Sequence, residues 1–244
     1  MSVPVRPCYN ESIMARRGKF IVIEGTDGSG KTEQFSRLLM RLPEGFSFKT
    51  IDFPQYDEPS SYFVREYLNG NYGALEDEEI GPRRASLFYA LDRFDASEKK
   101  LKKWLDDGVA VIANRYVGSN MGHQGGKIGD EKKRKDFFQW LSDLEYGTFG
   151  IPKPDLNIIL HMPAEIAQEL VDRKAARDYI GGKKRDLHEG NLDHLRHAEQ
   201  VYLEIAGLFP ENFTVVECAP QGKLLSIEEI HGKVWDVARK TLGL

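Results

Sequence analysis

Cysteine is scarce in this sequence, which contains only Cys8 and Cys218. The two residues lie far apart and form neither a CxxC pair nor a spacing typical of zinc ligands, so the pattern excludes a disulfide framework and a structural zinc site. A long chain with so little cysteine fits a reducing compartment, and we expect a cytoplasmic protein.

Long apolar runs and an excess of positive charge are also missing. The longest apolar runs, such as IVI at 21–23 and VAVIA at 109–113, are far shorter than the roughly 20 residues that cross a bilayer. The formal net charge of −4 gives no general attraction to nucleic acid. We therefore expect neither a membrane segment nor a nucleic-acid partner, and a bound anion must be held by local cations.

The composition predicts one folded unit. The 244 residues, 41% hydrophobic and 30% charged, suffice for an α/β domain with a sizeable core, and no linker divides them. We expect a single domain over 18–244. Residues 1–17 carry three arginines but no apolar stretch, which predicts a loose N-terminal extension and argues against a signal peptide.

Short apolar runs alternate with longer stretches of helical spacing. Such alternation predicts β-α crossovers and buried parallel strands. We expect strands at 20–25, 48–53, 109–115, 156–162 and 213–219, and helices at 33–42, 60–70, 85–108, 132–147 and 226–242. The basic run KKRK at 132–135 is interpreted as a solvated helix face, because the whole chain is acidic.

The segment GTDGSGKT at 25–32 matches the phosphate-loop pattern G-x-x-x-x-G-K-[ST] in full, between a predicted strand and a predicted helix. Glycines let the backbone wrap around phosphate oxygens, and the helix N-terminus adds partial positive charge. Lys31 can reach the β- and γ-phosphates, and the Thr32 hydroxyl can bind Mg²⁺. We predict an ATP and Mg²⁺ site formed by Gly25, Thr26, Gly28, Ser29, Gly30, Lys31 and Thr32.

This motif predicts the fold class more closely: a three-layer P-loop NTPase fold of the α/β class, with a central, mostly parallel five-stranded sheet flanked by helices. It does not identify the acceptor, because GTPases, motor ATPases and small-molecule kinases share the loop. Asp27 lies inside the loop, and it either is solvated or orients an acceptor group.

Four further residues could hold the second reactant. Tyr89 and Arg93 share one helical face, where a ring could stack on a base and a guanidinium could bond its carbonyl. The alternative is a core aromatic beside a surface arginine. Arg115 ends a predicted strand, where open α/β sheets bind ligands, and could clamp a monophosphate. The amide of Asn120 offers a donor and an acceptor to a pyrimidine edge.

The segment EGTDGSGKT resembles the EGxDGxGK phosphate loop of thymidylate kinases. More segments resemble the family pattern in the right order, so that the likeness extends over about 18–240. They are FPQYDEPSSYFVREYLNG (53–70), LFYALDRFD (87–95), NRYVGSNMGHQGG (114–126), PKPDLNIILHMP (152–163) and the arginine-rich DRKAARDYIGGKKRDLHE (172–189), which resembles the family's mobile lid.

The resemblance implies a homodimeric kinase that transfers phosphate from ATP to dTMP for dTTP biosynthesis. It implies a dTMP site around Asp27, Phe53, Tyr56, Tyr89, Arg93, Arg115, Ser119, Asn120 and Gln124, although Ser119 and Gln124 could equally be loop caps. The implied catalytic residues are Asp27, Lys31, Arg115 and the lid residues Arg173 and Arg177. A run of cations is by itself usually a solvated face.

Two positions depart from the family pattern. Asn114 replaces the aspartate of the Asp-Arg-Tyr triplet, and Gln55 stands where some relatives have an arginine. A neutral amide offers a metal's water shell only a dipole, so we expect either weaker metal binding or negative charge supplied by Asp27 and Glu24. The alternatives are a deoxynucleoside kinase or a non-catalytic nucleotide-binding regulator. One methyl group distinguishes dTMP from dUMP, and the sequence leaves that choice open.

Overall fold

The computed structural model describes residues 17–73, 81–178 and 192–244, with side chains in the last helix of the second range described as far as Arg173. Nearly all of the expected N-terminal extension (1–17) and most of the expected lid lie outside these ranges. Among the described helices, none combines the length and apolar character that a bilayer crossing requires.

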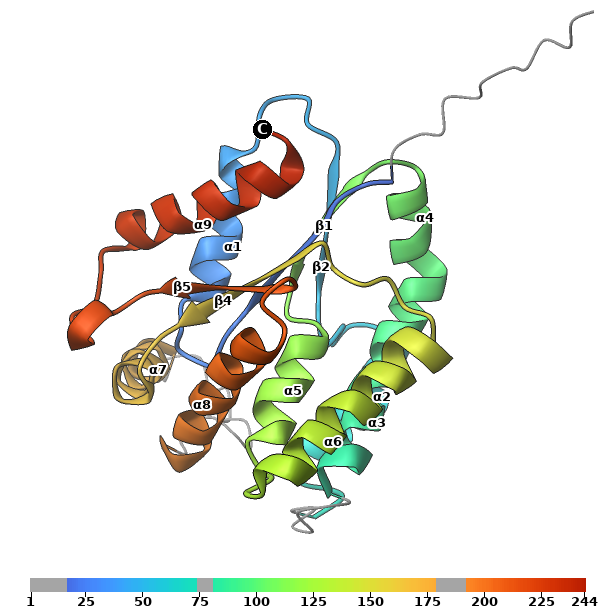
Figure 1. Cartoon of the computed structure of the whole chain (residues 1–244), viewed down its shortest axis with the longest axis vertical. Helices are drawn as coiled ribbons and strands as arrows, with labels where there is room; N and C mark the ends of the chain where they lie inside the picture. Colours follow the sequence, from blue (N-terminus) through green and yellow to red (C-terminus); the bar gives the residue numbers. More distant parts are fainter. Residues whose placement is uncertain (1–16, 74–80, 179–191) are drawn as a thin grey trace, which may run out of the picture.

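The centre of the molecule is a five-stranded sheet in the order β2-β3-β1-β4-β5, in which every neighbouring pair is parallel (Figure 1). The predicted α/β fold class is confirmed, and each predicted apolar run contains one strand. The strands are β1 (Phe20–Glu24), β2 (Phe48–Asp52), β3 (Ala110–Asn114), β4 (Leu156–His161) and β5 (Phe213–Glu217).

Helices cover both faces of the sheet (Figure 1). Because side chains alternate along a strand, β1 sends Ile21 and Ile23 to one hydrophobic cluster and Phe20 and Val22 to the other. The first cluster is closed by α1 (Lys31–Arg41) and α9 (Ile227–Leu242), with a contribution from α7 (Ala164–Asp178). The second is closed mainly by α3 (Gly81–Ala96), α5 (Val117–Gly125), α6 (Glu131–Ser142) and α8 (Leu192–Leu208).

Three predicted helices contain changes of helical type. The helix expected at 85–108 begins earlier, as α3, and continues through a π-helical turn at Ser97–Leu101 into α4 (Lys102–Asp106). The helix expected at 132–147 is α6 followed by a π-helical turn at Asp143–Thr148. The helix expected at 60–70 is a 3₁₀ turn (Pro59–Ser61) followed by α2 (Tyr62–Leu68).

The KKRK run lies on the outer side of α6. Lys132, Lys133 and Lys135 are exposed, and Arg134 donates through Nε to Glu204 at 2.6 Å. Lys135 forms an ion pair with Glu131 one turn earlier. The three lysines therefore form the solvated helix face that the sequence predicts, whereas Arg134 is half-buried against Glu204.

The functional edge of the sheet follows from the parallel strands. In the register of the sheet, Asn114 at the end of β3 pairs with Ile23 of β1 and Asp52 of β2. The loops that leave these strands must therefore meet at one carboxyl edge, where open α/β sheets bind their ligands.

We expect Leu38→Ala in α1 to lower the free energy of unfolding by about 2 to 5 kcal/mol, because it opens a cavity in a fully buried cluster. Met40→Ala in the same helix removes a side chain that is 77% exposed. This substitution should change the free energy of unfolding by less than about 0.5 kcal/mol. Urea unfolding of both variants checks this, and equal losses would contradict the assignment of the α1 face.

Candidate active site

Backbone conformation explains the glycines of the phosphate loop. Gly25, Gly28 and Gly30 have φ angles of 142°, 80° and 85°, in a region that side chains rarely adopt. A Cβ on Gly28 would lie 2.2 Å from the carbonyl oxygen of Ala167, and one on Gly25 would lie 2.8 Å from that of Leu160. The loop is therefore wrapped closely against β4 and α7, and α1 begins directly after it.

Polar groups of this loop are oriented for a ligand. Lys31 is 7% exposed and donates to the carbonyl oxygen of Thr26 at 2.6 Å, so it lies across the loop. The hydroxyls of Thr26 and Ser29 are buried without a hydrogen-bond partner among the described residues. Buried hydroxyls normally have partners, so these two fit a loop that receives them from a bound phosphate or water.

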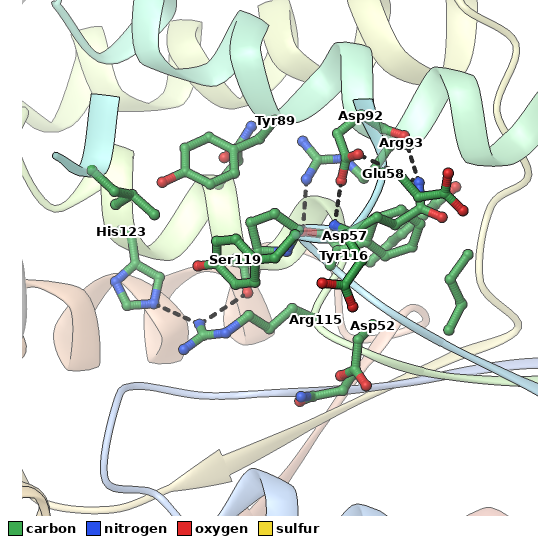
Figure 2. A pocket seen from close by; sticks show the side chains of 18 of the residues that line it. Asp52, Asp57, Glu58, Tyr89, Asp92, Arg93, Arg115, Tyr116, Ser119 and His123 are labelled. Atoms are coloured by element: carbon green, nitrogen blue, oxygen red, sulfur yellow. Dashed lines mark hydrogen bonds between the residues drawn. The ribbon is translucent and has the colours of Figure 1, made fainter. Parts of the chain in front are cut away.

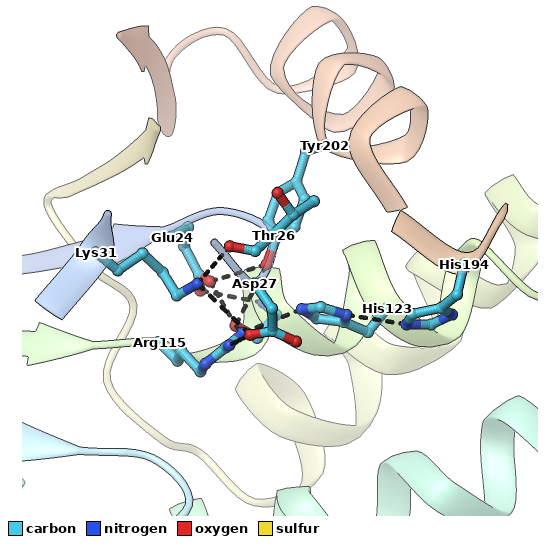
Figure 3. Close-up of polar contacts among 9 residues, drawn as sticks. Glu24, Thr26, Asp27, Lys31, Arg115, His123, His194 and Tyr202 are labelled. Carbon is cyan, nitrogen blue, oxygen red and sulfur yellow. Dashed lines mark hydrogen bonds and ion pairs between the residues drawn. The ribbon is translucent and has the colours of Figure 1, made fainter. Parts of the chain in front are cut away.

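An ion pair joins the loop to the strand beside it. The Arg115 Nη2 atom donates to Asp27 Oδ1 (Figure 3). Although burial alone would raise the pKa of the Asp27 carboxyl, Arg115 and then Lys31 hold it well below its usual value. The same pair keeps the pKa of Arg115 above its usual value against the opposing effect of burial. Asp27 is thus a charged residue bound to a cation.

Backbone geometry after β3 directs Arg115 toward the loop. Arg115 has a φ of 65°, which is uncommon for a residue with a side chain and recurs at functional sites. Its own N–H donates to Ile23 at 2.9 Å. Glu24, which is fully buried, stabilises the following turn by accepting from the N–H groups of Tyr116 at 2.8 Å and Ser119 at 3.1 Å.

Glu24 also accepts from the Ser119 hydroxyl at 2.6 Å, and burial raises the pKa of its carboxyl. The sequence left open whether Glu24 or Asp27 supplies negative charge in place of the family aspartate. Both carboxylates have other partners: Glu24 binds the start of α5, and Asp27 binds Arg115. The Asn114 Oδ1 atom is buried with no partner among the described residues.

A cavity of about 690 Å³ opens beside this ion pair (Figure 2). Its wall is built by the ends of β2 and β3, the segment after β2, and the facing sides of α3 and α5. Thr32 and each residue that the sequence assigned to the acceptor lie on this wall: Asp27, Phe53, Tyr56, Tyr89, Arg93, Arg115, Ser119, Asn120 and Gln124. Residues from distant parts of the chain thus meet in one place.

The arginine of the Tyr89/Arg93 pair is buried, which excludes the alternative of a surface arginine. Arg93 is 2% exposed and binds Glu145 with two hydrogen bonds of 2.6 and 2.5 Å. This occupies Nε and Nη2, while Nη1 lies 3.4 Å from the carbonyl oxygen of Tyr116. Each terminal nitrogen carries two N–H groups, so Nη1 keeps an N–H beyond its bond to Tyr116 that can serve a ligand.

Several residues on the wall were missed in the sequence. Asp92 accepts from the Gln55 N–H at 2.8 Å and from the Ser60 hydroxyl at 2.5 Å, and so holds the segment after β2. Asp92 lies three residues after Tyr89 and directly before Arg93 on α3, and this spacing could have identified it as a residue of the cavity wall. Asp52, Asp57, Glu58, Tyr116 and His123 also line the cavity. All but Asp52 lie inside the segments that resemble the family, but the sequence assigned them no role.

The lid residues are not part of this wall in the described structure. Arg173 is exposed on α7, with Nη2 3.4 Å from Glu169. Arg177 lies in the same helix, but beyond the described side chains. The rest of the expected lid, to residue 189, falls outside the described ranges.

A phosphate loop at the carboxyl edge of a parallel sheet, beside a cavity with an arginine at the junction, defines a P-loop kinase that acts on a small molecule. The sequence model of the thymidylate kinase family matches residues 23–231. The chain therefore belongs to the thymidylate kinase family, and the resemblance in the motifs is confirmed.

Comparison with individual relatives gives the same family. The chain is 32% identical over 190 residues to the thymidylate kinase of Mycobacterium tuberculosis, covering 76% of this chain and 85% of the relative. It is 30% identical over 205 residues to that of Clavibacter michiganensis, covering 83% and 88%. A solved thymidylate kinase structure from Candida albicans superposes with a TM-score of 0.66 at 25% identity, covering 93% of this chain and 94% of that one.

We expect Gly28→Ala to destabilise the protein more than Gly30→Ala. Both substitutions meet the cost of a positive φ, about 1 to 2 kcal/mol, but only the Cβ at Gly28 would clash with backbone, since that at Gly30 meets nothing within 4 Å. Urea unfolding without nucleotide measures the difference. A Gly30→Ala variant as unstable as Gly28→Ala would contradict the packing of the loop on α7.

Proposed function

We propose that this protein transfers the γ-phosphoryl group of ATP to dTMP, giving ADP and dTDP for dTTP synthesis in the cytoplasm. The observation that carries the proposal is the Asp27–Arg115 ion pair, which joins the phosphate loop to the acceptor cavity. Family membership supports the same substrates. Little covalent chemistry is required of the protein, because its task is to align two anions and stabilise the charge between them.

On the donor side, the loop at 25–32 holds the ATP phosphates with its N–H groups and the start of α1. Lys31, which lies across the loop, binds the β- and γ-phosphates in place of the Thr26 carbonyl. The Thr32 hydroxyl would hold Mg²⁺, and the Asn114 Oδ1 atom, which has no hydrogen-bond partner among the described residues, would offer a neutral acceptor to its water shell. When bound, Mg²⁺ would supply positive charge to the phosphates.

On the acceptor side, Arg115 binds the monophosphate and Ser119 lies beside it, 3.4 Å from Arg115 Nη1. The Tyr89 ring stacks on the base, and Arg93 Nη1 bonds its carbonyl. Gln124 Oε1 is buried without a partner among the described residues, so it can accept from a base N–H.

The remaining wall residues complete the acceptor site. Asn120 donates to the Ser86 carbonyl at 3.2 Å and offers its amide oxygen to the base. Phe53 and Tyr56 also line the cavity, where they would cover the sugar of the acceptor. We retain Arg173 and Arg177 as the lid cations that neutralise charge on the transferring group.

One observation favours a second function, phosphorylation of the 5′-hydroxyl of a deoxynucleoside. That reaction needs a carboxylate base, and Asp52 lines the cavity at the end of β2. An acceptor without phosphate would, however, make no use of a cation on the cavity wall, where Arg115 lies, so we place dTMP first.

A coupled assay of ADP release should give turnover that requires dTMP, with thymidine inactive. Lys31→Ala should reduce kcat by about 100-fold or more, because it removes a cation from the transferring phosphate. Lys135→Ala, an exposed lysine on α6, serves as the control and should leave the rate unchanged. Turnover of thymidine in preference to dTMP would instead establish the second function, and the same assay with dUMP measures the contribution of the base methyl group.

We also propose that the protein is a homodimer. Apolar side chains are exposed on two helices that contact each other, α2 and α3: Tyr62 (52%), Phe63 (46%), Leu87 (38%), Leu91 (43%) and Phe94 (37%). The spacing of Leu87, Leu91 and Phe94 puts them on one face of α3. Grouped apolar exposure of this kind marks an interaction surface. A second copy of the chain, as the family resemblance implies, would cover it.

We expect Leu91→Glu to convert the dimer to a monomer, because it places a charge in the centre of that face. Leu203→Glu, at an equally exposed leucine of α8, is the matched control and should stay dimeric. Light scattering after size exclusion gives the mass of each. A monomeric wild type would contradict the assignment.

A further inference from the structure

Two histidines form a chain behind the Arg115 guanidinium (Figure 3). Arg115 Nη1 lies 3.0 Å from His123 Nε2, and His123 Nδ1 lies 3.3 Å from His194 Nε2. The two rings are stacked, with centroids 5.5 Å apart and planes at 22°. His123 comes from α5 and His194 from the first turn of α8, so the chain links the acceptor cavity to a separate helix.

Hydrogen-bond chemistry allows one arrangement of protons in this chain. A guanidinium has donors only, so the bond from Arg115 requires that His123 Nε2 accepts. A neutral imidazole that accepts at one nitrogen carries its proton on the other, so His123 Nδ1 donates to His194 Nε2. His194 then carries its own proton on Nδ1.

The surroundings favour neutral rings. Burial lowers the pKa of His123 well below 6.5, and the nearby charges of Arg115 and Lys31 lower it further. Asp27 acts in the opposite direction without reversing the shift. From α8, the Tyr202 ring meets His123 edge-on at 6.0 Å.

The second ring is neutral for similar reasons. Burial lowers the pKa of His194 to about 4, with further lowering by the charges of Lys127 and His197 and an opposing effect of Asp27. A neutral His194 offers Nε2 as the acceptor that selects the Nδ1–H form of His123.

We propose that His123 is a positioning residue for the acceptor: in its neutral Nδ1–H form it accepts from Arg115 Nη1 and fixes the guanidinium plane that receives the phosphate, while His194 selects that form. Asp27 holds the other terminal nitrogen, so the two contacts together leave the guanidinium one orientation. This inference rests on the proposed function, in which Arg115 binds the phosphate of dTMP.

The kinetic test compares two substitutions. His123→Phe keeps a ring against Tyr202 and His194 but removes both nitrogens, and should raise the KM for dTMP about tenfold with the KM for ATP unchanged, as expected for a lost bond to a charged group. His123→Gln supplies an amide oxygen in place of Nε2 and should stay within about threefold of the wild type. His197→Phe, an exposed histidine one turn after His194, is the control and should change neither constant.

The pH profile separates positioning from packing. Protonated His123 cannot accept from Arg115, so wild-type kcat/KM for dTMP should fall as pH drops through the low pKa of His123. The dTMP phosphate also gains a proton at about pH 6, and this effect is the same for the wild type and for His123→Gln. His123→Gln should show that substrate effect alone, and a His123→Gln variant that keeps the additional fall of the wild type at low pH would contradict the role.

Nitrogen-15 spectra of the full chain with labelled histidine observe the tautomer directly. At neutral pH we expect His123 to carry its proton on Nδ1, with its signals identified by their loss in His123→Gln. His194→Phe should mix the two tautomers and raise the KM for dTMP, which keeps a test available if His123→Phe does not fold.

The outcomes are distinguishable. A proton on His123 Nε2, or a His123→Phe variant with wild-type constants, overturns the positioning role while dTMP turnover by the wild type leaves the proposed function standing. Absence of dTMP turnover in the wild type overturns the proposed function, and this role with it.

Discussion

The ion pair between Asp27 and Arg115 is the contact on which the site depends. Asp27 belongs to a phosphate loop whose glycines press it against neighbouring backbone, and Arg115 follows β3 in a left-handed conformation. Glu24, buried beneath them, fixes the turn that holds Arg115 in place. The phosphate loop and the cavity that we propose for the acceptor thus share one boundary, as a direct transfer between two bound phosphates would require.

Much of this arrangement was predictable because its signals are local. The strands were readable from apolar runs, the loop from its spacing, and the cavity residues from motif order. The hydrogen-bond partners of the cavity residues were not predictable, because each partner lies in a distant segment. Glu145, which binds Arg93, is 52 positions away from it, and His194, which contacts His123, is 71 positions away. Glu145 lies in the π-helical turn at Asp143–Thr148, and a single π-helical turn is too short to produce a recognisable hydrophobic periodicity in the sequence.

The two departures from the family pattern have different structural consequences. Gln55 is tied to Asp92 through its N–H, so the segment after β2 is held without the arginine that some relatives carry. Asn114 leaves a neutral, unpartnered oxygen beside a loop whose carboxylate already binds Arg115. The charge balance of the proposed metal site would therefore differ from that of a site with an aspartate at this position.

The most direct test of the account is a comparison of dTMP and thymidine affinity by calorimetry, in the wild type and in Arg115→Gln. If Arg115 holds the acceptor phosphate, the wild type binds dTMP more tightly than thymidine, and the substitution removes most of that difference while thymidine affinity stays the same. An unchanged preference for dTMP in Arg115→Gln would contradict the account, because the phosphate would then be held by other cations.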